Sequence, residues 1–249
     1  MDLNSDLGEG FGAWRMGDDE AMLDIVTSAN IACGFHAGDP GVMRRVCARA
    51  AERGVTIGAH VGYRDLAGFG RRALDISPAD LTDDVLYQIG ALDAFARAAG
   101  SSVKYVKAHG ALYNTAAVDP AQAAALVEGV RQFGTGLALL CPPDSEMLRA
   151  ASAAGVTGYA EAFADRAYTS EGRLVSRKLP GAVLHDADEV AARATAMATS
   201  GSVIDVDGGK LELRAVSLCV HGDTPGAVDI ARRIRASLAE AGVTVESFV

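Results

Sequence analysis

Short apolar runs alternate with amphipathic stretches along the whole chain of 249 residues. Between the runs, apolar residues recur at spacings of three and four, which is the pattern of a helix with one buried face. The runs themselves are typical of buried strands. They predict strands at Leu3–Asp6, Ala29–Cys33, Thr56–His60, Tyr105–His109, Leu137–Cys141, Thr157–Glu161 and Ala215–His221.

Capping residues and glycines mark where several of the helices begin and end. A Ser-Pro or Asp-Pro pair supplies an N-cap followed by a first-turn proline, and a glycine follows the last periodic residue. Asp39, just before Pro40, is interpreted as such an N-cap. The expected helices are Pro40–Arg53, one from Ser77-Pro78 to Gly100, one from Asp119-Pro120 to Phe133, and one from about Thr224 to Ala241.

A strand-then-helix order of this kind predicts an α/β fold with a parallel sheet covered by helices. About seven such units in this length favour a closed or nearly closed βα barrel over a doubly wound sheet. We find no break in composition and no fixed repeat, so residues 1–249 are expected to form a single domain. The least regular stretch, Asp165–His185, is expected to form loops and short strands over one face.

The composition indicates which binding partners and which cellular compartment can be expected. A formal net charge of -9 argues against nucleic acid, because phosphate binding needs a basic face. The stretch Met1–Asp6 lacks the features of a signal peptide, and no apolar run approaches the ~20 residues of a membrane span. The scattered cysteines suit a reducing compartment, so a cytoplasmic protein without a membrane is expected; they are Cys33, Cys47, Cys141 and Cys219.

Several polar residues fall at the C-terminal ends of the predicted strands. In a parallel barrel these ends meet at one rim, where the active sites of such barrels lie. A single histidine there could merely cap a buried carbonyl, but a whole set is harder to explain in that way. His36 follows a strand by a few residues, whereas His185 lies in the irregular stretch. The strand-end set is Asp6, His60, His109, Glu161 and His221.

Alternation along one strand places Lys107 and His109 on the same face. If that face is the barrel interior, Lys107 lies one layer below the rim and needs an acidic or hydrogen-bonding partner. The candidates are Asp6 and Glu161. Asn30 also requires partners, because it is an amide within an otherwise apolar strand.

Other motifs are absent or open to two interpretations. Arg71 and Arg72 lie in a glycine-rich loop and suit a carboxylate or phosphate, although a solvated turn would look the same. Neither a phosphate-binding loop of the Walker type, nor a nucleophile elbow, nor an H-E-x-x-H zinc motif occurs in the sequence. Cys33 is interpreted as a small core residue.

Several motifs in order, essentially end to end, resemble the LamB/YcsF-like family, which comprises the A subunits of 5-oxoprolinase. Local departures are Ser5 in place of Cys, Val61 and Arg64 in place of prolines, and Ala108 in place of a proline. The matching motifs are Asp2–Glu9, Ser28–Pro40, Ile57–His60, Gly68–Arg72, His109–Asn114, Phe163–Arg166 and Cys219–Asp223.

The resemblance implies the opening of 5-oxo-L-proline to L-glutamate with ATP hydrolysis, together with subunits B and C. It also implies a seven-stranded βα barrel related to metal-dependent polysaccharide deacetylases. ATP would then be bound with the partner subunits, because this chain has no recognisable nucleotide motif. Two alternatives stay open: a stand-alone metal-dependent amide hydrolase or deacetylase, and a non-catalytic barrel that binds a small metabolite.

The candidate residues fall into three sets. We expect catalysis by Asp6, Lys107, His60 and His109. A divalent metal, if one is used, would be held by Asp6, His60 and His109. Substrate binding is expected of Asn4, Asn30, His36, Arg71, Arg72 and Asp223.

Overall fold

The computed structural model describes residues 1–134, 136–222 and 226–249. None of the helices in these ranges has the length and apolarity that a membrane crossing needs. In chain order the elements are β1 (Asp2–Leu7), α1 (Asp19–Leu23), β2 (Ser28–Ala32), α2 (Pro40–Arg53), β3 (Thr56–Val61), the 3-10 turn η1 (Leu66–Gly68), α3 (Pro78–Ala98), β4 (Tyr105–Ala108), α4 (Gly110–Ala116), α5 (Pro120–Phe133), β5 (Ala138–Cys141), α6 (Glu146–Ala154), β6 (Thr157–Phe163), α7 (Ala187–Ser200), β7 (Ser202–Ile204), β8 (Lys210–Glu212), β9 (Ser217–Cys219) and α8 (Ala227–Glu240).

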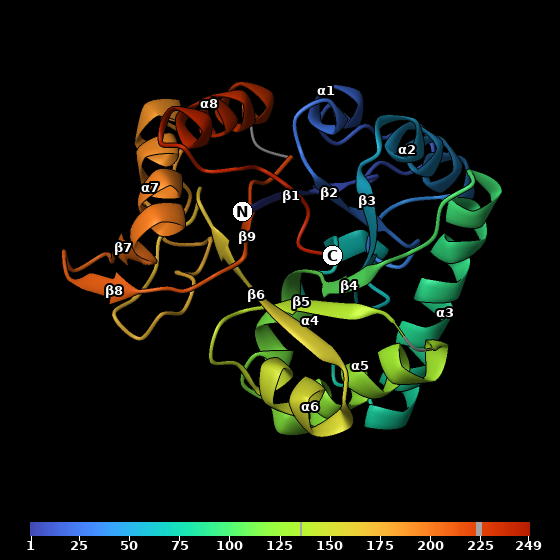
Figure 1. Ribbon diagram of the computed structural model, residues 1–249. Coiled ribbons are helices and arrows are strands. Elements are labelled where there is room, and N and C mark those ends of the chain that lie inside the picture. Colours follow the sequence, from blue (N-terminus) through green and yellow to red (C-terminus); the bar gives the residue numbers. More distant parts are fainter. Residues whose placement is uncertain (135, 223–225) are drawn as a thin grey trace.

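Seven parallel strands close into a barrel in the order β1-β2-β3-β4-β5-β6-β9. The ring closes because β9 pairs in parallel with both β6 and β1. Helices surround the strands, and α7 and α8 lie side by side next to the closing strands (Figure 1). The predicted α/β fold with a seven-stranded parallel barrel is confirmed.

The predicted helix signals act as expected. The side chain of Ser77 accepts a hydrogen bond from the backbone N–H of Asp80, and that of Asp119 accepts from Ala121. Asp39 is the N-cap of α2, because its Oδ1 accepts from the backbone N–H of Val42 at 2.9 Å. These side chains satisfy backbone donors that a helix leaves unpaired in its first turn.

Three local features differ from the expectation. Strand β4 ends one residue before His109, which is the N-cap of the unpredicted short helix α4. The antiparallel pair of β7 and β8 lies outside the barrel and was also not predicted. Thr224, the expected start of the last helix, lies outside the described residues, and α8 begins at Ala227.

The apolar core lies between the strands and the helices. Leu3 and Leu7 of β1 belong to it, together with helix residues such as Val46, Ile89 and Ile234. Because side chains alternate along a strand, the intervening positions of β1 point into the barrel. These positions hold Asp2, Asn4 and Asp6, so β1 contributes polar side chains to the barrel interior.

Aromatic rings close the barrel at the end where the strands begin. The ring of Tyr105 is buried, and its hydroxyl donates to Oδ1 of Asn30 at 2.6 Å. Phe248, near the end of the chain, contacts Tyr105 and Tyr159 with ring centroids 5.0 and 5.1 Å apart. The Tyr105 ring fits only because β3 carries Gly58, where a Cβ would lie 2.2 Å from the Cζ of Tyr105.

We expect Gly58→Ala to destabilise the protein by about 1–3 kcal/mol, the usual cost of an overpacked interior. Gly90→Ala in α3 is the matched control, because no heavy atom lies within 4 Å of its added Cβ. That control should stabilise the protein by up to about 1 kcal/mol through helix propensity. Urea unfolding of both variants measures the difference. Equal stability of the two would contradict the close packing of Tyr105 against Gly58.

Candidate functional site

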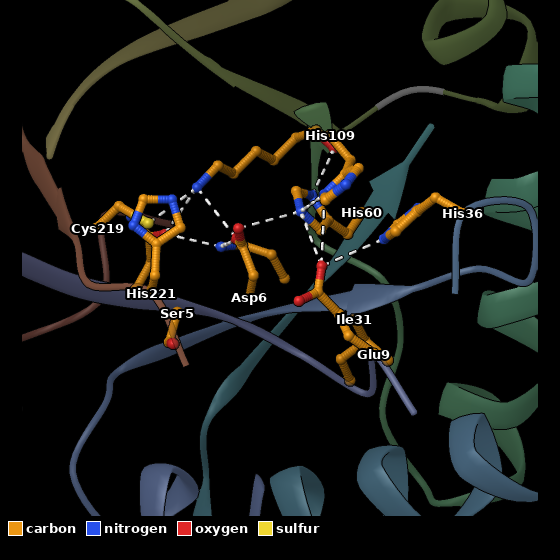
Figure 2. A network of polar contacts seen from close by, with 12 residues as sticks. Ser5, Asp6, Glu9, Ile31, His36, His60, His109, Cys219 and His221 are labelled. Carbon is orange, nitrogen blue, oxygen red and sulfur yellow. Dashed lines mark hydrogen bonds and ion pairs between the residues drawn. The ribbon is translucent and has the colours of Figure 1, made fainter. Parts of the chain in front are cut away.

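Residues from five strands and the loops that follow them converge at the C-terminal end of the barrel. They form two adjoining groups, one around Lys107 and one of histidines around Glu9. Figure 2 shows Asp6, Cys219 and His221 on one side and Glu9 with His36, His60 and His109 on the other. The contributing segments are β1 with its loop (Asp6, Glu9), the loop after β2 (His36), β3 (His60), β4 (Lys107), the N-cap of α4 (His109), β6 (Glu161) and β9 with its loop (Cys219, His221).

The ammonium group of Lys107 is the centre of the first group. It is 2% exposed, and its Nζ lies 2.9 Å from Oε2 of Glu161 and 3.2 Å from Oδ1 of Asp6. It also donates to Oδ1 of Asn4 and Sγ of Cys219, each at 3.2 Å. Lys107 therefore points into the barrel, and both of its predicted acidic partners are confirmed.

Charge pairing determines the protonation states of Lys107 and Asp6. Burial alone would lower the pKa of Lys107, but the negative charges of Asp6 and Glu161 hold it well above its ordinary value. Burial would raise the pKa of Asp6, but His60 and Lys107 outweigh it and hold that pKa well below its ordinary value. Asp6 and Lys107 are therefore an ionised pair at neutral pH.

Glu161 responds differently to the same neighbour. Burial raises its pKa, and the attraction of Lys107 offsets this only in part. One ammonium cannot fully neutralise two buried carboxylates, so Glu161 binds a proton more readily than Asp6 does. The thiol of Cys219 also has a pKa raised well above its ordinary value by burial, and it stays protonated beside Lys107.

The amides Asn4 and Asn30 lie below this group in the interior. Nδ2 of Asn30 donates to Oδ1 of Asn4 at 2.7 Å and to Oδ1 of Asp6 at 2.9 Å. Asn4 donates in turn to Oγ of Ser217 at 2.7 Å and to Oε2 of Glu161 at 3.4 Å. Asn4 and Asn30 are both fully buried, so the structure places these two predicted substrate-binding residues within the network beneath the rim.

The second group consists of Glu9, His36, His60 and His109, each of which offers one ligand atom within 4.8 Å of the others. Oε1 of Glu9 lies 3.3 Å from Nε2 of His36, 3.4 Å from Nδ1 of His109 and 3.9 Å from Nε2 of His60. Nδ1 of His109 and Nε2 of His60 are 3.0 Å apart. Among the described residues this is the set that could share one metal ion.

This set differs from the expected ligands Asp6, His60 and His109. Oδ2 of Asp6 does lie 3.3 Å from Nε2 of His60, but its Oδ1 is engaged by Lys107 and Asn30. Glu9, rather than Asp6, belongs to the set whose ligand atoms lie close enough together to share one ion. His36, expected to bind substrate, joins the two predicted histidines.

An Asp165–His221 pair lies next to Lys107 and was not predicted as a unit. Nδ1 of His221 is 2.7 Å from Oδ2 of Asp165. Burial raises the pKa of Asp165, but the contact with His221 outweighs it, and the pKa is lower than usual. The ring of Phe163 stacks on His221 with centroids 5.5 Å apart, and Nζ of Lys107 lies 5.0 Å from the centroid of Phe163. These contacts fix the ring of His221 beside the buried charges.

The two arginines of the loop after β3 have different surroundings. Arg72 forms an ion pair with the buried carboxylate of Asp65, the N-cap of η1. The guanidinium of Arg71 lies 4.8 Å from the ring centroid of Phe69, and that ring meets the rings of His36 and His109 edge to face. Arg71 is therefore the arginine of this pair that faces the histidine group. Asp223, the remaining predicted residue, lies outside the described residues.

Cys33 lies in the apolar core, as its position in the sequence predicted. Burial raises the pKa of its thiol, which makes it a poor nucleophile. Glu9 was the main omission among the sequence candidates. The available signal was an acidic residue between two glycines directly after a strand that ends in Asp6.

Comparison with known proteins identifies relatives of this chain. The model of the LamB/YcsF family matches residues 1–249. The 5-oxoprolinase A subunit of Nocardia farcinica is 65% identical over 249 residues, which cover 100% of this chain and 99% of that protein. The protein of the same name from Kocuria rhizophila is 60% identical over 248 residues, covering 100% and 98%.

Among solved structures, the lactam utilization protein of Thermus thermophilus is similar over 99% of both chains, with a TM-score of 0.94 and 44% sequence identity. The agreement in fold and the match over the full length confirm the resemblance that the motifs indicated. The chain belongs to the LamB/YcsF family.

Proposed function

We propose that this chain is the A subunit of an ATP-dependent 5-oxoprolinase, which opens 5-oxo-L-proline to L-glutamate together with subunits B and C. The observation that carries the proposal is the end-to-end identity of 65% to a relative named as the A subunit of 5-oxoprolinase. The buried polar site at the barrel rim supports it, because opening a lactam needs a base, a proton donor and a stabilised oxyanion. We further propose that the complex acts in the cytoplasm, in keeping with four free, buried cysteines.

The need for ATP follows from the substrate. In 5-oxoproline the amine and the carboxyl group stay in one molecule, so the ring re-closes with a high effective molarity. Coupling to phosphoryl transfer drives the opening and makes the ring carbonyl more electrophilic. The sequence has no Walker-type loop, so we assign the nucleotide chemistry to the complex with subunits B and C. This chain would bind the substrate or its phosphorylated form and direct water to it.

Ring opening requires a water oxygen to bond to C5, the bond between C5 and nitrogen to break, and the nitrogen to gain a proton. If the carbonyl oxygen carries a phosphoryl group, the acyl phosphate that results is hydrolysed by a second water molecule, and the phosphoryl group leaves as inorganic phosphate. We propose that Asp6 accepts the proton of the water and that Lys107 stabilises the negative charge on the carbonyl oxygen. A carboxylate of such low pKa is a weak base, which suits a carbonyl already activated by phosphoryl transfer.

The histidines divide into two roles in this proposal. His60 and His109 converge on Glu9, which favours metal binding over the direct catalytic role that was also expected of them. His221 is oriented by Asp165, as the general acids and bases of many enzymes are oriented by a carboxylate. We propose His221 as the donor of the proton to the leaving nitrogen.

A stand-alone metal-dependent amide hydrolase is the second candidate. The observation that favours it is the set of three histidines and one glutamate, which could hold a metal ion near Asp6. A bound ion would polarise a carbonyl or lower the pKa of a water molecule. Activity without ATP and without partner subunits would distinguish this function from the first.

The isolated chain should hydrolyse neither ATP nor 5-oxoproline at a useful rate, because the nucleotide chemistry is assigned to the complex. Addition of subunits B and C should produce glutamate from 5-oxoproline in step with ADP. A coupled assay of glutamate and ADP measures both products. ATP-dependent glutamate formation by the chain alone would contradict the assignment of the nucleotide chemistry to the complex. A reconstituted complex without activity would exclude the proposed function.

Asp6→Asn should lower the turnover of the reconstituted complex by at least ~10²-fold, the usual contribution of a general base. The amide keeps an oxygen that can accept from Lys107 and Asn30, so the fold should persist; circular dichroism checks this. Asp207→Asn, in an exposed turn, is the matched control and should leave turnover unchanged. Turnover near the wild-type value in a folded Asp6→Asn complex would remove Asp6 from the mechanism.

Arg71→Ala and Arg72→Ala form a matched pair. Arg71 faces the histidine group, so its loss should raise the KM for 5-oxoproline at least ~10-fold with little change in kcat. Arg72 is held by Asp65, so its loss should act mainly on the stability of the loop. Steady-state kinetics and thermal unfolding separate the two effects. The opposite pattern would assign substrate binding to Arg72.

A further inference from the structure

We propose that Glu9, His36, His60 and His109 form a binding site for one divalent transition-metal ion, with Nδ1 of His109 and Nε2 of the other two histidines as ligands. The proposal does not depend on the substrate or on the partner subunits. It rests on four features of the described residues: the tautomers of two rings, an unsatisfied third ring, the distances between ligand atoms, and the packing around them.

Backbone carbonyls set the tautomers of two histidines. Nε2 of His109 lies 2.8 Å from the carbonyl oxygen of Phe69, and Nδ1 of His60 lies 3.2 Å from that of Lys107. A carbonyl oxygen can only accept, so each of these nitrogens carries a proton. The nitrogens left to bind a metal ion are therefore Nδ1 of His109 and Nε2 of His60, which face each other at 3.0 Å. A metal ion between these two nitrogens and the carboxylate of Glu9 would be bound by all three groups at once.

His36 gives independent support. The residue is fully buried, and neither of its ring nitrogens has a hydrogen-bond partner among the described residues. Its ring stacks on that of His109 with centroids 3.8 Å apart, which leaves its Nε2 3.3 Å from Oε1 of Glu9. A buried imidazole without partners is costly, and a metal ion would supply the missing interaction.

The distances fit a four-coordinate ion. Metal–ligand bonds of about 2.0–2.1 Å in a tetrahedron place the ligand atoms about 3.3–3.4 Å apart. The distances from Oε1 of Glu9 to His36 and His109 are 3.3 and 3.4 Å, and His109 to His60 is 3.0 Å. The distance between Glu9 and His60 is longer, at 3.9 Å, and all four ligand atoms lie within 4.8 Å of one another. Three imidazoles and one carboxylate suit zinc and similar ions better than magnesium or calcium, which prefer oxygen ligands.

The loop after β3 is shaped around this site. A Cβ at Gly62 would lie 2.9 Å from Nδ1 of His36, and one at Gly70 would lie 2.7 Å from Cδ2 of His109. Phe69 adopts a left-handed conformation with φ of 55°, which is unusual for a residue with a side chain, and its carbonyl holds His109. Backbone carbonyls that orient ligand histidines in this way are typical of metal sites.

Metal binding is tested on the isolated chain. Protein stripped with EDTA is dialysed against Zn²⁺ and analysed by mass spectrometry of the bound metal, and Co²⁺ gives a visible spectrum that reports coordination. We expect about one ion per chain. Glu9→Gln and His36→Ala should each weaken binding by at least ~100-fold, whereas His185→Ala, at an exposed histidine, should change nothing.

A second measurement uses the wild-type protein, so it does not depend on whether the variants fold. Nitrogen-15 spectra of the imidazole rings, recorded with and without Zn²⁺, identify the nitrogen that binds. The metal should shift Nδ1 of one histidine and Nε2 of two. Binding through Nε2 of all three histidines, unchanged affinity in both folded variants, or no binding by the folded wild type would overturn the proposal. None of these measurements involves 5-oxoproline or ATP, so their failure leaves the proposed function standing.

Discussion

The buried ammonium of Lys107 is the constraint on which the site depends. An isolated charge inside a protein costs several kcal/mol, so it must be surrounded by groups that compensate it. Its partners are Asp6 on β1, Glu161 on β6 and Cys219 on β9, while Lys107 itself lies on β4. Four strands must therefore be in place before the charge is stabilised, which couples the closure of the sheet to the assembly of the site.

The polar interior follows from the same requirement. Barrels of this general kind are commonly filled by branched aliphatic side chains. Here the apolar side chains of β1 face the helices, and the interior positions hold acids and amides that bond one another. The hydrogen bond from Tyr105 to Asn30 extends this network down to the aromatic rings that close the barrel. The large apolar cluster that includes Leu3 and Leu7 thus lies outside the strands, whereas the buried charges of the site lie inside the barrel.

The sequence was sufficient to predict the barrel and part of the candidate site. The period-two alternation through Lys107 correctly indicated both of its acidic partners, because strand geometry constrains direction. Glu9 was missed because it lies in a glycine-rich loop, where no periodicity shows which way a side chain points. Arg71 and Arg72 are adjacent, and only the three-dimensional position of Asp65 separates their surroundings.

The pairing of β1 with β9 has a consequence for synthesis of the chain on the ribosome. Strand β1 is made first, but the neighbour on its second edge is made about 210 residues later, a delay of about 10–40 s at about 5–20 residues per second. During that time β1 has an edge that can pair with other nascent chains. Its alternate positions hold Asp2, Asn4 and Asp6, and such polar residues discourage pairing of this kind. The same side chains that serve the finished barrel interior would thus protect the growing chain from aggregation.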